Sequence, residues 1–280
     1  LRALACAALA IIGVDTVGPY GILVGLAPVA ATLIGAGRER GLVTPGPDAP
    51  WSELSSALGY LLAGSVMAQL LVNAGVFAVQ ILADADERGP GGVAGRFLNG
   101  LIIARVPLFM FQAVQASLLP KLAHLAGSGR HEDFRTGLKR LLAVVVAIGS
   151  VATVTAFAIG PFVVTTLFGD EFRLGHSDLA YLAGASAVYM LALALAQALI
   201  ALANYSRVVL GWAAGLAGFV VVTAMGGELL PRVERGFLAG SIAAAIVMAI
   251  SVYNMLSRGL VGGHDADEIL EASHQLPIEP

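Results

Sequence analysis

The sequence has little charge and almost no cysteine. Charged residues make up 12% of its 280 residues, whereas 58% are hydrophobic and the mean hydropathy is +0.83. A soluble domain carries about 25% charged residues, and so few polar side chains cannot cover the surface of so apolar a chain. Part of that surface must therefore face lipid. The single cysteine, Cys6, excludes an internal disulfide and a cysteine-based metal cluster.

Motifs that mark common catalytic sites are also missing. The sequence contains no Walker loop, no Gly-x-Ser-x-Gly, no His-Glu-x-x-His and no paired carboxylates within an apolar run. Its five histidines show no metal-ligand spacing within a helical turn. The net charge of -3, without a continuous basic patch, argues against nucleic acid as a partner. We therefore expect no enzyme, no cofactor, no metal and no nucleic-acid partner.

Long uncharged runs recur along the chain, and each has the length of about 20 residues that a helix needs to cross a bilayer. They are Val17–Gly37, Ala57–Ala83, Leu141–Gly169, Leu179–Ser206, Val208–Gly227 and Gly236–Ser257, with Phe97–Pro120 as another run that Arg105 interrupts. Ala3–Val14 is too short to span, and we interpret it as the end of a truncated helix. Because the chain begins at Leu1, we expect it to be a piece of a longer protein. The runs predict an all-α polytopic bundle of about eight membrane helices.

The connectors between these runs carry the charge, and its sign alternates. One side holds the basic residues Arg2, Arg38, Arg40, Lys121, Arg130, Arg135, Lys139, Arg140, Arg207 and Arg258. The other side holds five arginines, Arg88, Arg96, Arg173, Arg232 and Arg235, alongside the acidic residues Asp15, Asp84, Asp86, Glu87, Asp170, Glu171, Asp178, Glu228 and Glu234. The excess of Lys and Arg places the first side, and with it both ends of this sequence, in the cytoplasm. No acidic residue lies within any of the apolar runs, so no proton or sodium site can be recognised.

Two connectors suggest how the chain is organised. The Pro- and Gly-rich stretch Arg38–Glu53 predicts a linker between two bundles, with 1–37 before it and 54–258 after it. Lys121–Arg140 predicts a short amphipathic helix with Phe134 and Leu138 on one face. Its basic residues either contact anionic lipid headgroups or form an ordinary positive-inside loop. The polar residues 259–280 predict a flexible cytoplasmic tail.

Arg105 is the most informative single residue. An arginine at the centre of a membrane helix costs about 2.5–3.5 kcal/mol on insertion scales, so it usually faces a cavity or a partner. Without an acidic partner, it suits an anionic substrate such as a phosphate or pyrophosphate. The alternatives are that it reaches the membrane interface, or pairs with backbone carbonyls that Pro107 leaves free. Gln112, seven residues on, shares its helix face.

Polar side chains recur on one face of each of two other helices. Ser65, Gln69, Asn73 and Gln80 form the first set, and Ser186, Tyr189, Gln197 and Asn204 form the second. Hydroxyls and amides facing lipid would be costly, so both sets should face protein or water. They either line a polar cavity suited to sugar hydroxyls or hydrogen-bond neighbouring helices together. We take Arg105, Gln112, Gln69, Asn73, Gln80, Tyr189, Gln197 and Asn204 as candidate substrate-binding residues.

The segments ARVPLFMFQAVQASLLPKLAHLA (104–126), GRHEDFRTGLKRLL and TTLFGDEF carry a family resemblance. They resemble the second half of MOP-type flippases, and more closely the polysaccharide-biosynthesis membrane proteins related to O-antigen and lipid II flippases. The resemblance covers Trp51 to Arg258, and Leu1–Gly37 would match the last two helices of a first lobe. It implies two six-helix lobes in a V around a hydrated cavity, in the bacterial cytoplasmic membrane. The missing N-terminal lobe would then be a partner of this segment.

The resemblance also implies a function, which is translocation of an undecaprenyl-pyrophosphate-linked oligosaccharide or a peptidoglycan precursor. Arg105 would be the residue that engages the pyrophosphate, and membrane lipids would surround the bundle. One alternative is an ion-coupled multidrug exporter of the same superfamily, which would need an acidic residue in the cavity. A second is a membrane-embedded glycan polymerase or transferase, which would use Asp84, Asp86 and Glu87 at the outer face.

Overall fold

A computed structural model describes residues 6, 9–13, 16–38, 51–89, 91–128 and 130–257 of the chain. The chain consists of two compact units, Leu1–Trp51 and Ser52–Pro280. Most of the expected linker, 39–50, and the expected tail, 259–280, lie outside the described residues. So does about half of the expected helix stub at 3–14.

The first unit contains α2 (Val17–Arg38), which matches the predicted span Val17–Gly37 closely. Its window Gly18–Gly35 is long and apolar enough to cross a membrane. Large apolar side chains along it are exposed within the unit, among them Ile22, Leu26 and Leu33. Such a helix is stable only where lipid or another apolar surface covers it.

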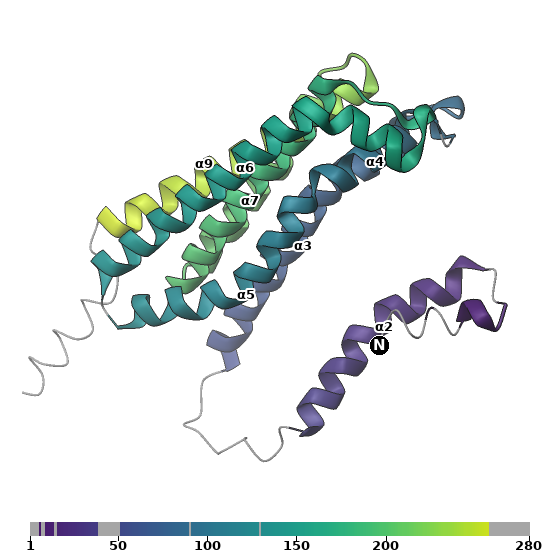
Figure 1. The fold of residues 1–280 in the computed structure, drawn as a ribbon. Helices are drawn as coiled ribbons and strands as arrows, with labels where there is room; N and C mark the ends of the chain where they lie inside the picture. Colours follow the sequence, from purple (N-terminus) through teal and green to yellow (C-terminus); the bar gives the residue numbers. More distant parts are fainter. Residues whose placement is uncertain are drawn as a thin grey trace, which may run out of the picture. The chain divides into compact units, whose positions relative to one another are not determined.

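The second unit is a bundle of seven long helices joined by short turns (Figure 1). They are α3 (Trp51–Leu82), α4 (Val93–Ala104), α5 (Val106–Gly127), α6 (His131–Phe168), α7 (His176–Ala201), α8 (Tyr205–Ala224) and α9 (Leu229–Ser257). Two short 3₁₀ turns, η2 (Asp86–Arg88) and η3 (Asp170–Phe172), precede α4 and α7. No strand occurs in the part of the chain that the structure describes.

The described helices agree with the predicted membrane spans. Six of them are long and apolar enough to cross a membrane, and a seventh span results if α4 and α5 cross together as one bent pair. The eighth expected helix is the truncated stub, about half of which is not described. The chain is therefore an all-α, multi-pass membrane protein, as its composition predicts.

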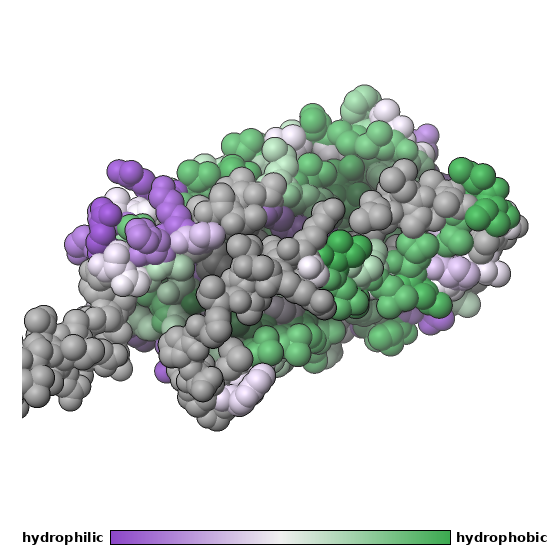
Figure 2. All heavy atoms as spheres, turned by 90° about the horizontal axis from the view of Figure 1, so that it is seen from below, coloured by the Kyte–Doolittle hydropathy of each residue, from purple (hydrophilic) through white to green (hydrophobic). Residues whose placement is uncertain are grey.

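Burial differs sharply between the helices and separates the interior of the bundle from its lipid-facing surface. In α7, 61% of the span is buried, whereas only 17% of the α6 span is buried. The exposed side of α6 carries large apolar side chains such as Phe157, Ile159 and Phe162. Figure 2 shows hydrophobic residues along the flank of the bundle and hydrophilic ones gathered at one end. Exposing so many apolar side chains to water would be unfavourable, so this flank is the surface that hydrocarbon covers.

Helices α8 and α9 approach each other at glycines. A Cβ atom built on Gly211 would lie 2.5 Å from Met248 Cγ, and one built on Gly240 would lie 2.6 Å from the Gly215 carbonyl oxygen. Only glycine fits at these positions, which is the role that the four-residue spacing of Gly211 and Gly215 predicts for small residues in membrane helices. This close contact between α8 and α9 places Trp212 of α8 in the interior of the bundle, where the residue is 2% exposed.

Two helix starts differ from the sequence prediction. Helix α9 begins at Leu229, so Glu234 lies inside it and is 1% exposed, although the sequence placed this residue in an outer connector. A proline in the first helical turn, here Pro231, is compatible with a helix, and charged residues can belong to a spanning helix before its apolar run begins. Helix α6 likewise begins at His131, so Lys121–Arg140 forms no separate amphipathic helix but the ends of two long helices. Its predicted apolar residues, Phe134 and Leu138, are buried.

Candidate functional site

A polar cavity in the described part of the second unit has a volume of about 520 Å³. It lies among α3, α5, α7 and α8, beside the junction of α4 and α5. Its lining includes most of the residues that the sequence singled out, namely Gln69, Asn73, Arg105, Gln112, Tyr189 and Gln197. The volume is in the range of about 300–1,000 Å³ that is typical of ligand sites. Substrate binding by these residues stays a prediction.

Arg105 lies at a break between two helices, whereas the sequence placed it inside one continuous helix. Helix α4 ends at Ala104, α5 begins at Val106, and the two axes differ by 45°. Pro107 is the second residue of α5. Its ring has no N–H to donate and crowds the carbonyl four residues earlier, so the helix bends at this point. The bend directs the Arg105 side chain toward α3.

The Arg105 guanidinium is held by neutral acceptors. Nη2 donates a hydrogen bond to the backbone carbonyl oxygen of Val72, and Nη1 donates one to Asn73 Oδ1 at 3.4 Å. Nε is buried and has no hydrogen-bond partner among the described residues. No carboxylate in this part of the chain forms an ion pair with Arg105. The carbonyl therefore comes from α3 and not from the carbonyls that Pro107 leaves free, and the positive charge of Arg105 is uncompensated.

Three polar residues of α3 face the cavity one turn apart. Ser65, Gln69 and Asn73 all line it, as their four-residue spacing predicts. Asn73 Nδ2 donates to the Gln69 carbonyl oxygen at 2.9 Å, which leaves Asn73 Oδ1 facing Arg105. The Gln69 side chain forms no hydrogen bond within the described residues, and the residue is exposed and lines the cavity. Its amide is therefore free to bind a ligand.

Tyr189 joins α7 to α3 at the wall of the cavity. Its hydroxyl donates a hydrogen bond to the Ala68 carbonyl oxygen at 2.9 Å, and the residue is 3% exposed. Its ring lies 5.3 Å from Trp212 and 6.2 Å from Phe237, centroid to centroid. These tilted aromatic contacts and the buried hydrogen bond hold the side chain in one place. Tyr189 is therefore a rigid part of the wall.

Gln197 lines the cavity two helical turns from Tyr189. Its Oε1 atom is buried and has no hydrogen-bond partner among the described residues. A buried acceptor without a partner costs about 1–3 kcal/mol unless water or a ligand reaches it. Together with Arg105 Nε, it is one of two buried polar atoms without a partner that belong to residues of the lining.

Two of the predicted site residues lie outside the cavity. Gln80 is on the same face of α3 as Asn73, but seven residues further along, or about 10 Å along the axis. Asn204 follows the end of α7 at Ala201 and a turn in which Ala203 has a φ of 53°, so it no longer shares the α7 face. Its Nδ2 atom contacts Met255 Sδ at 3.2 Å. Ser186, from the same predicted set, is buried and does not line the cavity.

Aromatic residues in the lining were missed by the sequence reasoning. Tyr60, Phe109, Tyr205 and Trp212 all line the cavity. Tyr60 precedes Gln69 by nine residues on α3, which is half a turn away from the face of the polar set, so the period that identified that set could not have found it. Trp212 gives no such signal, because one aromatic side chain in an apolar helix is usually a core residue.

Acidic residues lie elsewhere. None is among the described residues that line the cavity. Glu87 accepts a hydrogen bond from the Asp84 backbone N–H at 3.1 Å, so it caps the turn that follows α3, where the sequence placed a possible catalytic acid. The Asp86 side chain lies outside the described part. In that part, no group of three His, Cys, Asp or Glu side chains is arranged to hold a metal ion.

Comparison with known proteins gives distant relatives without an assigned activity. No protein-family model and no solved structure matches the chain. Similar curated sequences include an uncharacterized protein from Mycobacterium bovis and uncharacterized proteins from two strains of Mycobacterium tuberculosis. Each is 28% identical over 207 residues, which are 72% of this chain and 44% of the relative. The chain thus spans less than half the length of these relatives.

Proposed function

We propose that the chain is the second lobe of a MOP-type flippase of the bacterial cytoplasmic membrane, which moves a lipid-linked oligosaccharide or peptidoglycan precursor across it. The single observation that carries this proposal is Arg105, an uncompensated cation at a helix break, facing a polar cavity within the span of the bundle. An arginine within a membrane is costly and is usually retained for function. An anion that enters the cavity would neutralise it.

The lining suits an anionic sugar derivative better than a hydrophobic drug. A guanidinium binds phosphate or pyrophosphate oxygens through two parallel hydrogen bonds. The amides of Gln69, Gln112 and Gln197 offer donors and acceptors to hydroxyl groups, and Tyr60 and Trp212 offer flat apolar faces. With about 520 Å³, the cavity has room for a diphosphate and part of a glycan. The lipid tail would stay in the membrane.

Binding of the anion gives a way to couple the substrate to a conformational change. Charge-assisted hydrogen bonds are about twice as strong as neutral ones, so phosphate oxygens would displace the Val72 carbonyl and Asn73 Oδ1 from the guanidinium. Arg105 connects α4 to α5 and is tied to α3 only by these two contacts. Loss of the tie would let the α4–α5 bend change. Such bends at broken helices are where transporters rock around a central site.

The experiment is complementation of the full-length parent gene carrying Arg105→Ala or Arg105→Lys. The leaflet location of the lipid-linked precursor and the amount of surface glycan are measured. With Arg105→Ala, we expect precursor to accumulate in the inner leaflet while the protein still inserts in the membrane. With Arg105→Lys, we expect partial export, because lysine keeps the positive charge but lacks the two parallel N–H donors of the guanidinium. Arg173→Ala is the matched control, because this exposed arginine lies in an outer turn away from the cavity. Unchanged export in Arg105→Ala would refute the proposal.

A further inference from the structure

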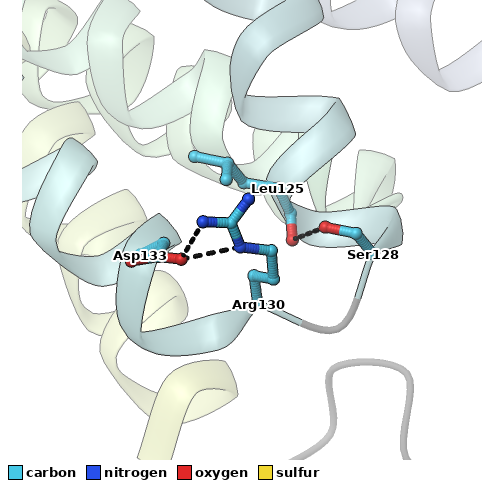
Figure 3. Close-up of polar contacts among 4 residues, drawn as sticks. All are labelled: Leu125, Ser128, Arg130 and Asp133. Carbon is cyan, nitrogen blue, oxygen red and sulfur yellow. Dashed lines mark hydrogen bonds and ion pairs between the residues drawn. The ribbon is translucent and has the colours of Figure 1, made fainter.

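Polar contacts form at the end of α5 and at the start of α6, in a basic part of the bundle. Ser128, the residue after α5, donates its hydroxyl to the Leu125 carbonyl oxygen at 3.3 Å (Figure 3). Arg130, the residue before α6, donates from Nε and Nη2 to Asp133 Oδ2, both at 2.7 Å. The charge of Arg130 is therefore compensated by Asp133, in the first turn of the same helix.

Between the two helices lies a groove of about 320 Å³, which we name the α5–α6 groove. It is lined by Lys121, Leu122 and Leu125 of α5 and by Gly137, Arg140, Leu141 and Val144 of α6. Gly137 keeps it open, because a Cβ atom there would have only Leu125 Cδ1 within 4 Å, at 4.0 Å. The groove thus has apolar walls and two cations. A protein surface that faces water does not require the apolar walls, and a surface that faces lipid does not require the cations.

No carboxylate among the described residues neutralises the two cations. Lys121 and Arg140 are both exposed, and neither forms an ion pair with a carboxylate in the described residues, where the Arg130–Asp133 pair is the one that forms. Val144, one helical turn from Arg140, is 54% exposed and leads from the cations toward the hydrocarbon. The groove therefore runs from a positively charged end to an apolar end.

We propose that the α5–α6 groove binds an anionic glycerophospholipid of the cytoplasmic leaflet. Lys121 and Arg140 would hold the headgroup phosphate, and Leu141 and Val144 would contact the first part of an acyl chain. The occupant has to be an amphiphile, because a soluble anion would leave the apolar wall uncovered and a neutral lipid would leave both cations unpaired. The excess of Lys and Arg at this end assigns it to the cytoplasmic leaflet, where anionic lipids face such residues. This site is separate from the Arg105 cavity and does not depend on the proposed transport function.

The test measures lipid selectivity at the groove itself. The full-length protein with Val144→Trp is reconstituted in vesicles of phosphatidylcholine and phosphatidylglycerol, and one of the two lipids is brominated so that it quenches a nearby tryptophan. Subtracting the signal of the protein without the new tryptophan isolates the reporter from Trp51 and Trp212. We expect the reporter to prefer phosphatidylglycerol, and Lys121→Gln and Arg140→Gln each to lower this preference about fivefold.

The matched control is Lys139→Gln, which removes the same charge from the exposed neighbour of Arg140, outside the groove. Its lipid preference is expected to stay within about twofold of the parent's, since only charges close to the headgroup contribute fully. Equal losses in Lys139→Gln and Arg140→Gln would overturn the proposal in favour of diffuse surface attraction. So would a reporter without preference, or glycerol phosphate competing as well as the intact lipid. Circular dichroism and a single elution peak check that each variant folds.

Discussion

The close contact of α8 and α9 allows the most quantitative prediction. We consider Gly240→Ala. The new Cβ atom would lie 2.6 Å from the Gly215 carbonyl oxygen, 3.0 Å from Leu71 Cδ1 and 3.1 Å from Phe219 Cβ. A leucine side chain can turn away, but a backbone oxygen moves only if the whole of α8 moves. The substitution must therefore separate two helices that also support the cavity wall through Trp212.

The size of the effect follows from these distances. Ordinary contact begins at 3.4 Å, so α8 has to move by about 0.8 Å, and a gap of that size loses a quarter to a half of the local dispersion energy. Overpacking of this kind costs about 1–3 kcal/mol, against a gain of up to about 1 kcal/mol because alanine favours helix over glycine. We expect a net loss of about 1–2 kcal/mol in the free energy of unfolding. For a chain of this size that lowers the Tm by about 2–8 °C.

The assay is thermal unfolding of the full-length protein in detergent, followed by tryptophan fluorescence. Gly59→Ala is the matched control, because a Cβ atom there meets no heavy atom within 4 Å. It is expected to leave the Tm unchanged or to raise it slightly. If Gly240→Ala were as stable as Gly59→Ala, the close packing of α8 against α9 would be wrong.

Three further predictions concern single side chains. Tyr189→Phe removes the hydrogen bond to the Ala68 carbonyl and should cost about 1 kcal/mol in stability by chemical denaturation; no loss would mean that the bond is not formed. Glu234→Gln keeps the volume of a buried side chain whose Oε1 atom has no partner, without a charge to bury, so the Tm should be unchanged or higher; a drop of several degrees would point to a needed carboxylate. Gln69→Ala should reduce transport of the precursor several-fold because its amide faces the cavity, whereas Gln80→Ala, outside it, should not; equal effects would contradict the location of the cavity.

The membrane helices could be predicted from the sequence because their signal is local. A run such as Leu179–Ser206 needs only its own length and apolarity to be recognised, and α7 occupies most of it. The residue at which a helix begins is determined less by the local sequence than the presence of the helix is. The apolar run at Gly236 marks the hydrocarbon region and not the first residue of α9, which is why Glu234 was assigned to a connector.

The candidate site could be predicted in part for the same reason. Spacing fixes which residues share a helix face, so Gln69 and Asn73 were identified together with Arg105 on another helix. Spacing does not fix how far a cavity extends along that face, so the predicted set included Gln80, which does not line the cavity. It also does not show where a helix ends, and Asn204 was included because the turn at Ala203 could not be foreseen.

The partners of Arg105 depend on tertiary structure alone. The sequence offered an anionic ligand, the membrane interface or a carbonyl left free by Pro107 as alternatives. The carbonyl of Val72 is 33 residues away in sequence and becomes a neighbour only because α3 packs against the α4–α5 break. No pattern within one helix contains that information.

The most direct test of the central claim is transport by the purified full-length protein in vesicles. A fluorescent undecaprenyl-pyrophosphate oligosaccharide is placed in the membrane, and its exposure on each face is followed with an impermeant quencher. We predict that the protein moves this lipid between leaflets, and that Arg105→Ala abolishes the movement while Arg173→Ala leaves it intact. Absence of movement with the parent protein, or equal movement with Arg105→Ala, would contradict the claim that the Arg105 cavity carries a lipid-linked pyrophosphate.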